Sequence, residues 1–252
     1  MVKRTLAALL VLFCCLTQVS LSGQAEKDTG KKSAAKKATK KTDKKQAKWQ
    51  DTFDEDKADL ASTGKSTYFI LEPGYVLTFK DPKGAELIIT VLDETKTVDG
   101  VETRVVEERE TKNGQLAEVS LNWFAISKKT GNVYYFGEDS KEYKDGKVVS
   151  QSGSWEAGKG GAKFGLMMPG KTEVGQRYYQ EVAPKAAMDR AENMSVSETM
   201  EVPAGKFKNV LKTEESSALE SGKGNKCYAP GVGLIQDEDF VLVSYGNKKS
   251  AK

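Results

Sequence analysis

The chain has 252 residues, of which 38% are hydrophobic and 30% are charged, and its formal net charge is +3 at pH 7. It contains no histidine, which excludes Ser-His-Asp and Cys-His nucleophile systems, histidine general bases and histidine-containing zinc sites. Pairs of carboxylates remain as possible catalytic groups, but so acidic a chain holds such pairs by chance, so we expect no enzyme activity and no cofactor.

The first 25 residues have the pattern of a cleavable export signal. Residues 1–4 are positively charged, residues 6–16 form an apolar run, and residues 20–25 end in a small-residue cleavage motif. The run is shorter than the roughly 20 apolar residues that a transmembrane helix needs, and no other stretch of the sequence reaches that length. We therefore expect a mature chain without a transmembrane segment, in an extracytoplasmic location that is periplasmic or secreted.

The cysteines argue against a lipid anchor and against a disulfide. Cys14 and Cys15 lie in the apolar run, but the bulky Phe13 precedes them where a lipid-attachment site has small residues. Lipoprotein anchoring is therefore the less favoured alternative. Removal of the signal leaves only Cys227, so no intramolecular disulfide can form, and we expect this thiol to be buried and unreactive.

Residues 26–65 are predicted to be a disordered linker, first rich in lysine and then acidic. Residues 26–48 hold too few apolar side chains to offset the entropy of the chain. Four lysine doublets at nearly helical spacing are the candidate contacts with a polyanion: Lys31, Lys32, Lys36, Lys37, Lys40, Lys41, Lys44 and Lys45. They could bind an anionic envelope polymer or a membrane surface. Nucleic acid is disfavoured because the arm has no aromatic or arginine residues for base stacking, and a simple solvated tether is the competing interpretation.

Residues 66–246 alternate short runs rich in Val, Ile, Tyr, Phe and Thr with turn signals such as Asn113-Gly114 and Asp145-Gly146. Turns about a dozen residues apart predict a single, mainly β domain, an antiparallel meander that forms a half-barrel, an open barrel or a sandwich. The only helix predicted is a short one at residues 183–193. Residues 247–252 are predicted to be a disordered tail.

The run 119–125 has the alternation of a half-buried strand. Its odd-numbered residues, which include Trp123, are apolar, whereas Ser120 and Asn122 are polar. This pattern predicts that the odd-numbered side faces the core, although Phe124 breaks the alternation. The densest acidic runs, residues 107–110 and 237–239, read most simply as solvated acidic faces, and the second could weakly hold calcium.

Trp123, Tyr135 and Met167 are the candidate ligand-binding residues. Residues 133–136 are apolar on both faces, so this strand either lies centrally in a sandwich or offers a hydrophobic face to a ligand. Met167 lies in an apolar, glycine-rich stretch that could form a flexible loop over a pocket. Ordinary core packing is the competing interpretation for each of the three.

Two parts of the sequence resemble a group of uncharacterised secreted bacterial β proteins. One is the segment 122–146, and the other combines Val-Pro-Ala-Gly-Lys-Phe at 202–207 with Cys-Tyr-Ala-Pro-Gly-Val-Gly-Leu-Ile at 227–235. The distal pattern is similar to one in extracytoplasmic β proteins related in shape to the outer-membrane lipoprotein carriers. The resemblance covers about residues 66–245 and implies an exported open barrel or half-barrel, but no particular activity.

These features predict an exported, non-enzymatic binding module that holds an apolar or amphiphilic ligand, such as a lipid, in the concave face of a curved sheet. The alternative is a structural or interaction protein held at an anionic cell-envelope surface by its lysine-rich arm. A curved sheet with an unfilled apolar interior would favour the first hypothesis, and a fully packed sandwich would favour the second.

Overall fold

The computed structural model describes residues 47–247, in which the one helix is the short 3-10 helix η1 (Lys57–Asp59). The predicted export signal, the lysine doublets and residues 248–252 lie outside the described residues. Within residues 47–247, no helix is long and apolar enough to cross a membrane. The strands in chain order are β1 (Leu60–Ala61), β2 (Gly64–Lys65), β3 (Ile70–Leu71), β4 (Tyr75–Lys80), β5 (Ala85–Val98), β6 (Val101–Lys112), β7 (Gln115–Ser127), β8 (Val133–Lys144), β9 (Lys147–Ser150), β10 (Trp155–Glu156), β11 (Lys163–Met168), β12 (Arg177–Tyr179), β13 (Glu181–Val182), β14 (Asp189–Val202), β15 (Gly205–Ser217), β16 (Gly224–Ala229), β17 (Gly233–Asp237) and β18 (Phe240–Asn247).

Local turn chemistry explains the long hairpins from β5 to β9. Asp99, Asn113 and Asp145 have φ angles of 49°, 52° and 52°, and each is followed by a glycine with positive φ. This is the two-residue type I′ turn, whose twist matches that of the strands on either side. Strands β4 to β8 therefore pair in chain order, and β14 to β18 form a second antiparallel series.

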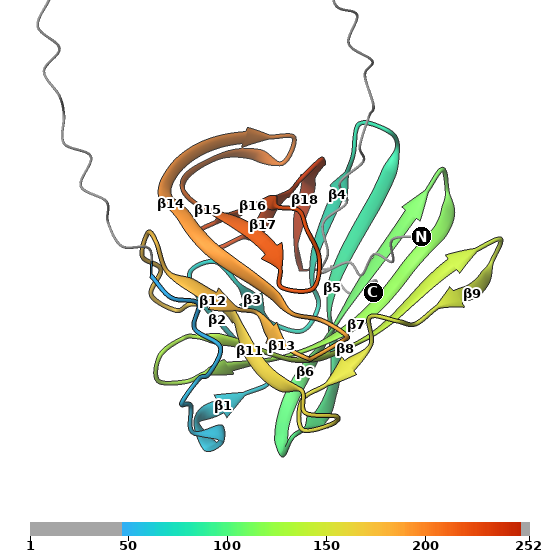
Figure 1. Ribbon diagram of the computed structural model, residues 1–252. Coiled ribbons are helices and arrows are strands. Elements are labelled where there is room, and N and C mark those ends of the chain that lie inside the picture. The colour runs from blue at the N-terminus through green and yellow to red at the C-terminus, as the bar shows by residue number, and fades with distance from the viewer. Residues whose placement is uncertain (1–46, 248–252) are drawn as a thin grey trace, which may run out of the picture.

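Long-range pairing bends these two series into a nearly closed barrel (Figure 1). The last strand, β18, returns to pair with β4 and joins the two series. On the opposite side, β12 pairs with β14 while β13, which begins two residues after β12 ends, pairs with β11. The prediction of a mainly β, antiparallel domain is confirmed, and of the three predicted shapes the chain adopts the barrel.

A close backbone approach at the seam between β11 and residues 177–182 gives a testable consequence. A Cβ at Gly165 would lie 2.7 Å from the Glu181 nitrogen and closer still to the Gln180 carbonyl group. Because backbone cannot swing aside, we expect Gly165→Ala to lower the free energy of unfolding by about 1–3 kcal/mol. Chemical denaturation would measure the loss. The exposed Lys163→Ala on the same strand should stay within about 0.5 kcal/mol of wild type, and an equally small effect at Gly165 would contradict this account of the seam.

The predicted helix at residues 183–193 is wrong. Residues 183–187 form a turn in which the Ala187 nitrogen donates to the Ala183 carbonyl at 2.9 Å, and β14 begins at Asp189. From Asp189 to Asn193 burial alternates with period two, as a strand requires. The ladder with β15 therefore outweighs the local helix preference.

The prediction that residues 49–65 are poorly ordered is also wrong, because they lie against the barrel. The guanidinium groups of Arg177 and Arg190 lie 4.0 Å and 4.7 Å from the centre of the Trp49 ring. The Tyr134 hydroxyl donates to Oε2 of Glu55 at 2.8 Å, and β1 pairs with β7. The partners of this segment are distant in sequence, so local composition did not reveal them.

Strand β7 buries side chains on both of its faces. Trp123 and Ala125 of the apolar face are buried as predicted, at 6% and 0% exposure, but the polar face is buried too. The even-numbered Glu118, Ser120 and Asn122 are buried in the barrel interior, at 7%, 1% and 4% exposure. They satisfy one another and their neighbours, since Asn122 Nδ2 donates to Ser120 Oγ at 3.0 Å and Ser140 Oγ donates to Glu118 Oε1 at 2.9 Å. The interior of this barrel is therefore partly polar, and the polar residues of this alternating strand face the interior, although polar residues in such a pattern normally face solvent.

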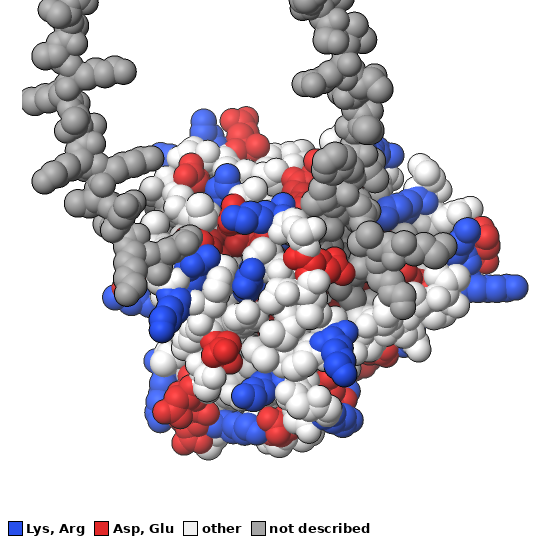
Figure 2. Space-filling view, viewed as in Figure 1, with Lys and Arg blue, Asp and Glu red and all other residues white. Residues whose placement is uncertain are grey.

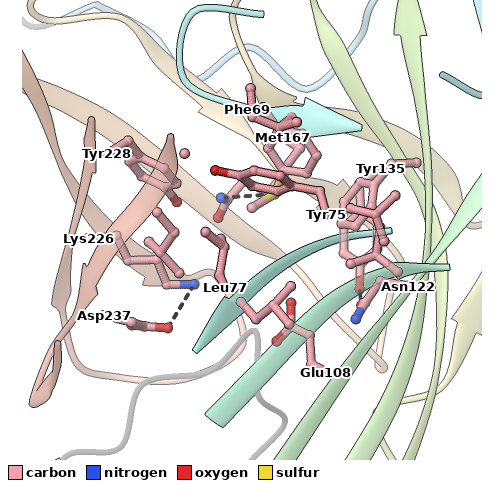
Figure 3. A pocket seen from close by; sticks show the side chains of 18 of the residues that line it. Phe69, Tyr75, Leu77, Glu108, Asn122, Tyr135, Met167, Lys226, Tyr228 and Asp237 are labelled. Carbon is pink, nitrogen blue, oxygen red and sulfur yellow. Dashed lines mark hydrogen bonds and ion pairs between the residues drawn. The ribbon is translucent and has the colours of Figure 1, made fainter. Parts of the chain in front are cut away.

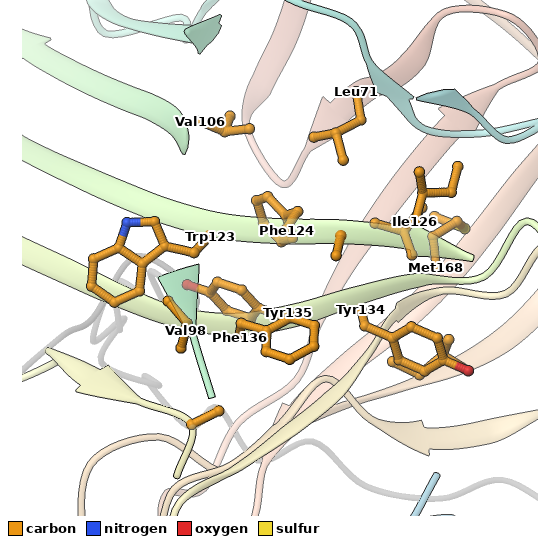
Figure 4. Packing of buried hydrophobic residues seen from close by; sticks show 14 of the residues in the cluster. Leu71, Val98, Val106, Trp123, Phe124, Ile126, Tyr134, Tyr135, Phe136 and Met168 are labelled. Carbon is orange, nitrogen blue, oxygen red and sulfur yellow. The ribbon is translucent and has the colours of Figure 1, made fainter. Parts of the chain in front are cut away.

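The hydrophobic core consists of two clusters of buried side chains. In the larger cluster Phe124 stacks on Tyr135 with ring centres 4.7 Å apart (Figure 4). The partly buried Phe164 packs against this cluster and stacks on Phe136 at 4.9 Å. The smaller cluster contains Phe79, which is fully buried beside the second series of strands. Between the clusters the barrel is not completely filled.

Candidate functional site

The candidate site is a cavity inside the barrel, seen from close by in Figure 3. Its volume, counted as space open to the centre of a water-sized sphere, is about 90 Å³. At roughly 15 Å³ per water on this measure, it is several times larger than a single-water void. The cavity is lined by Phe69, Ile70, Tyr75, Leu77, Ile89, Val91, Val106, Glu108, Asn122, Phe124, Tyr135, Glu138, Met167, Gln180, Glu181, Glu215, Lys226, Tyr228, Val232, Gly233, Leu234 and Asp237.

One side of the cavity is apolar and is covered by residues 64–75. Phe69 and Ile70 from this segment line the cavity. The segment is held by the turn between β16 and β17, because the Gly231 nitrogen donates to the Thr67 carbonyl at 2.8 Å and the Tyr75 hydroxyl donates to the Val232 carbonyl at 2.9 Å. The distal sequence motif at 227–235 therefore forms part of the cavity wall and secures the segment that covers it.

The other side carries an ion-pair network centred on Lys226 of β16. Its ammonium nitrogen lies 3.2 Å from Oε2 of Glu215 and 3.5 Å from Oδ2 of Asp237, and Figure 3 shows the second contact. Burial disfavours the charged ammonium, but Asp237 and Glu215 outweigh it and hold the pKa of Lys226 well above its ordinary value. Gln180 Nε2 donates to Oε1 of Glu215 at 3.2 Å, which completes the network.

Three further carboxyl groups line the cavity without taking part in an ion pair among the described residues: Glu108, Glu138 and Glu181. Burial raises the pKa of Glu108 to about 7. Burial, reinforced by the charges of neighbouring carboxyl groups, holds the pKa values of Glu138 and Glu181 well above the ordinary range of a glutamate. A charge that enters the cavity would change the pKa values of these three carboxyl groups.

The structure brings together two of the three predicted ligand-binding residues. Tyr135 and Met167 both line the cavity. Trp123 does not, because it lies on the other face of β7, where the Lys96 ammonium is 3.2 Å from its ring centre and a separate outer cleft begins. The physical reason is that the even-numbered face of β7 encloses the cavity, so Asn122 and Phe124 line it instead.

Sequence reasoning missed the charged residues of the site. The runs 107–110 and 237–239 are not simply solvated faces, because Glu110 is 2% exposed and both Glu108 and Asp237 line the cavity. Acids on strands normally face solvent, so no local signal separates these from surface residues. Among the described residues, no group of three or more Asp, Glu, Cys or His side chains is placed to hold a metal ion.

The face of the molecule drawn in Figure 2 shows no excess of acidic side chains. On the face drawn in Figure 2, basic and acidic side chains are interspersed without a large patch of either sign. In the separate outer cleft, which Glu138 also lines, Glu156 contacts Lys96 at 3.0 Å and Lys159 at 2.8 Å. The barrel interior combines apolar surface with several carboxyl groups that have no ion pair among the described residues.

Comparisons with known proteins yield two similar solved structures. No protein-family model matches the chain, and no curated protein does. A protein from Bacteroides fragilis, described as exported and as having a YmcC-like fold, is 16% identical with a TM-score of 0.38. A protein from Parabacteroides distasonis, described as a lipoprotein, is 13% identical with a TM-score of 0.35. Each comparison covers 73% of this chain and 100% of the other. Neither likeness extends to function, and the likeness to outer-membrane lipoprotein carriers stays a prediction.

Proposed function

We propose that this chain is an exported, non-enzymatic binding module that holds an apolar or amphiphilic ligand inside its barrel. The observation that supports the proposal best is the cavity, in which apolar side chains of β4, β5 and β17 face unfilled space. Protein interiors are normally packed to crystal density, with few voids larger than a water molecule. A space of this size with one apolar and one polar side is what a ligand of mixed polarity requires.

Partial exposure of the lining side chains to the cavity also supports a binding role. Ile89, Leu234 and Met167 are only half-buried although they belong to the barrel wall. A ligand that covers such apolar surface gains about 25 cal/mol for each Å² removed from water. The export signal in the sequence supports an extracytoplasmic setting, in which apolar molecules need a protein to cross water.

Filling the cavity should weaken ligand retention. In native mass spectrometry of the full mature protein purified from its host's envelope, we expect a co-purifying amphiphile on wild type. Ile89→Trp places a larger side chain in the cavity, so the Kd for the amphiphile should rise about tenfold or more, which is a loss of roughly 1.4 kcal/mol of binding free energy, and occupancy should fall. Leu234→Trp, from a different strand of the wall, should have the same effect.

The matched control is Val149→Trp, because Val149 of β9 is 58% exposed and does not line the cavity. Thermal unfolding of each variant separates loss of ligand from loss of fold. An empty wild-type protein, or equal occupancy in all variants, would overturn the binding proposal. Release of an empty protein from the envelope by salt would instead favour a structural protein held there by its lysine-rich arm.

A further inference from the structure

The ionisable side chains that line the cavity are mostly acidic. Five carboxyl side chains and one ammonium group face it, namely Glu108, Glu138, Glu181, Glu215, Asp237 and Lys226. Two of the carboxyl groups are accounted for, because Glu215 and Asp237 both form ion pairs with Lys226. The structure therefore leaves an excess of acidic groups at the cavity without a cation from the described part of the chain.

Two of the remaining carboxyl groups carry an oxygen that lacks any partner. Glu138 is 2% exposed and Glu181 is fully buried. Oε2 of each is buried without a hydrogen-bond partner among the described residues. A buried polar atom left unpaired costs on the order of 1–3 kcal/mol, and more when it is charged. Native proteins rarely retain two such atoms in one place unless something else satisfies them.

The surroundings of these two groups suit a cation better than an anion. Beside Glu138 the wall is aromatic, since Phe124 and Tyr135 line the cavity and stack on each other with ring centres 4.7 Å apart. An anionic headgroup would find Lys226 already engaged by two carboxylates. The apolar residues Phe69, Ile89 and Leu234 extend the same cavity away from the acids.

We propose that the ligand of this cavity is a cationic amphiphile whose ammonium group is held by Glu138 and Glu181 and whose apolar chain lies along Phe69, Ile89 and Leu234. This inference rests on the proposed binding function. The class of ligand is an alkylammonium compound, because its positive charge complements the carboxyl groups of Glu138 and Glu181.

The proposal also predicts how the affinity for a cation depends on pH. The pKa values of Glu138 and Glu181 are raised chiefly by burial, so an entering ammonium group displaces protons from them. Affinity for a cation should therefore rise as the pH increases from about 5 to about 8, below the pKa of a primary amine. The titratable groups that act on this pair from neighbouring elements are Glu108, Glu118, Tyr135, Asp189 and Glu215. All of them are acids, so their ionisation strengthens the same trend. Lys226 faces the same cavity but is paired with Glu215 and Asp237.

The test compares three probes with the same alkyl chain: decylammonium, decanoate and decanol. Isothermal titration calorimetry with the full mature protein, in buffers of different ionisation enthalpy, measures both affinity and proton release. We expect decylammonium to bind most tightly, and Glu138→Gln or Glu181→Gln to weaken it about tenfold each. Decanol binding should change less than about twofold, because it lacks the charge.

The matched control is Glu110→Gln, a glutamate that is 2% exposed and does not line the cavity. It should leave decylammonium binding unchanged. If decylammonium and decanol bind equally and neither glutamine variant alters them, or if decanoate binds best, the inference is overturned while the proposed binding function stands. If none of the three probes binds the wild-type protein, the proposed function itself fails.

Discussion

Replacing Phe136 with alanine is expected to lower the free energy of unfolding by about 3–5 kcal/mol, the usual cost of removing a buried aromatic ring. Phe136 is fully buried in the larger core cluster and stacks on Phe164 with a ring-centre distance of 4.9 Å. It lies where β8 has one residue more than β7, because Trp123 pairs with Gly137 while Phe124 pairs with Tyr135. Loss of the ring would leave a void that a closed barrel cannot collapse to fill.

Urea denaturation of wild type and variant at one pH measures this loss. Val149→Ala is the control, since Val149 is 58% exposed on β9 and should change stability by less than about 0.5 kcal/mol. A Phe136→Ala protein within about 1 kcal/mol of wild type would show that the ring is not part of the core as described.

We also expect the free energy of unfolding to fall as the pH rises, because buried carboxyl groups must ionise. Burial, with the charges of Glu110, Glu108 and Glu142 adding to it, raises the pKa of Glu118 from 4.5 to about 7, although a hydrogen bond from Ser140 opposes the shift. The folded protein therefore keeps a proton that the unfolded chain releases between these two values. Stability from this group is complete below about pH 4.5 and declines by roughly 3 kcal/mol as the pH passes 7, at about 1.36 kcal/mol per pH unit.

Glu118→Gln should remove the part of this pH dependence that Glu118 contributes. Glutamine has the same shape and cannot ionise, so the variant should match wild type near pH 4 and exceed its stability at pH 8 by up to about 3 kcal/mol. Some decline should persist in the variant, because burial also raises the pKa values of Glu108 and Asp189 to about 7. Stability that rises with pH in the wild type, or an unchanged profile in the variant, would refute the buried-carboxyl account.

The turns and the fold class could be predicted from the sequence because they depend on neighbouring residues. The Asn113-Gly114 and Asp145-Gly146 turns adopt the positive φ angles that their residue types favour. Tyr135 and Met167 could also be predicted as interior residues, because an apolar run of the sequence places its side chains in the interior of the fold. Whether that interior is filled or hollow is not a local property.

The acidic half of the site could not be predicted, because its position depends on contacts between distant strands. Glu138 on β8, Glu181 on β13 and Lys226 on β16 meet only when residues 177–182 pair with both β11 and β14. The same closure decides that Asn122 lines the cavity, whereas Trp123 is buried on the other face of β7. An alternating pattern has the same period in both orientations, so sequence alone does not reveal which face is enclosed.

The sequence by itself determined the β class, the hairpin turns and the pattern of an export signal, since each depends on residues that are adjacent in the chain. Only the tertiary structure decided where the cavity lies, which acids line it and where Trp49 docks. The reason is physical: turn conformation is set by the local backbone, whereas burial and pKa are set by whichever distant strands close around a side chain.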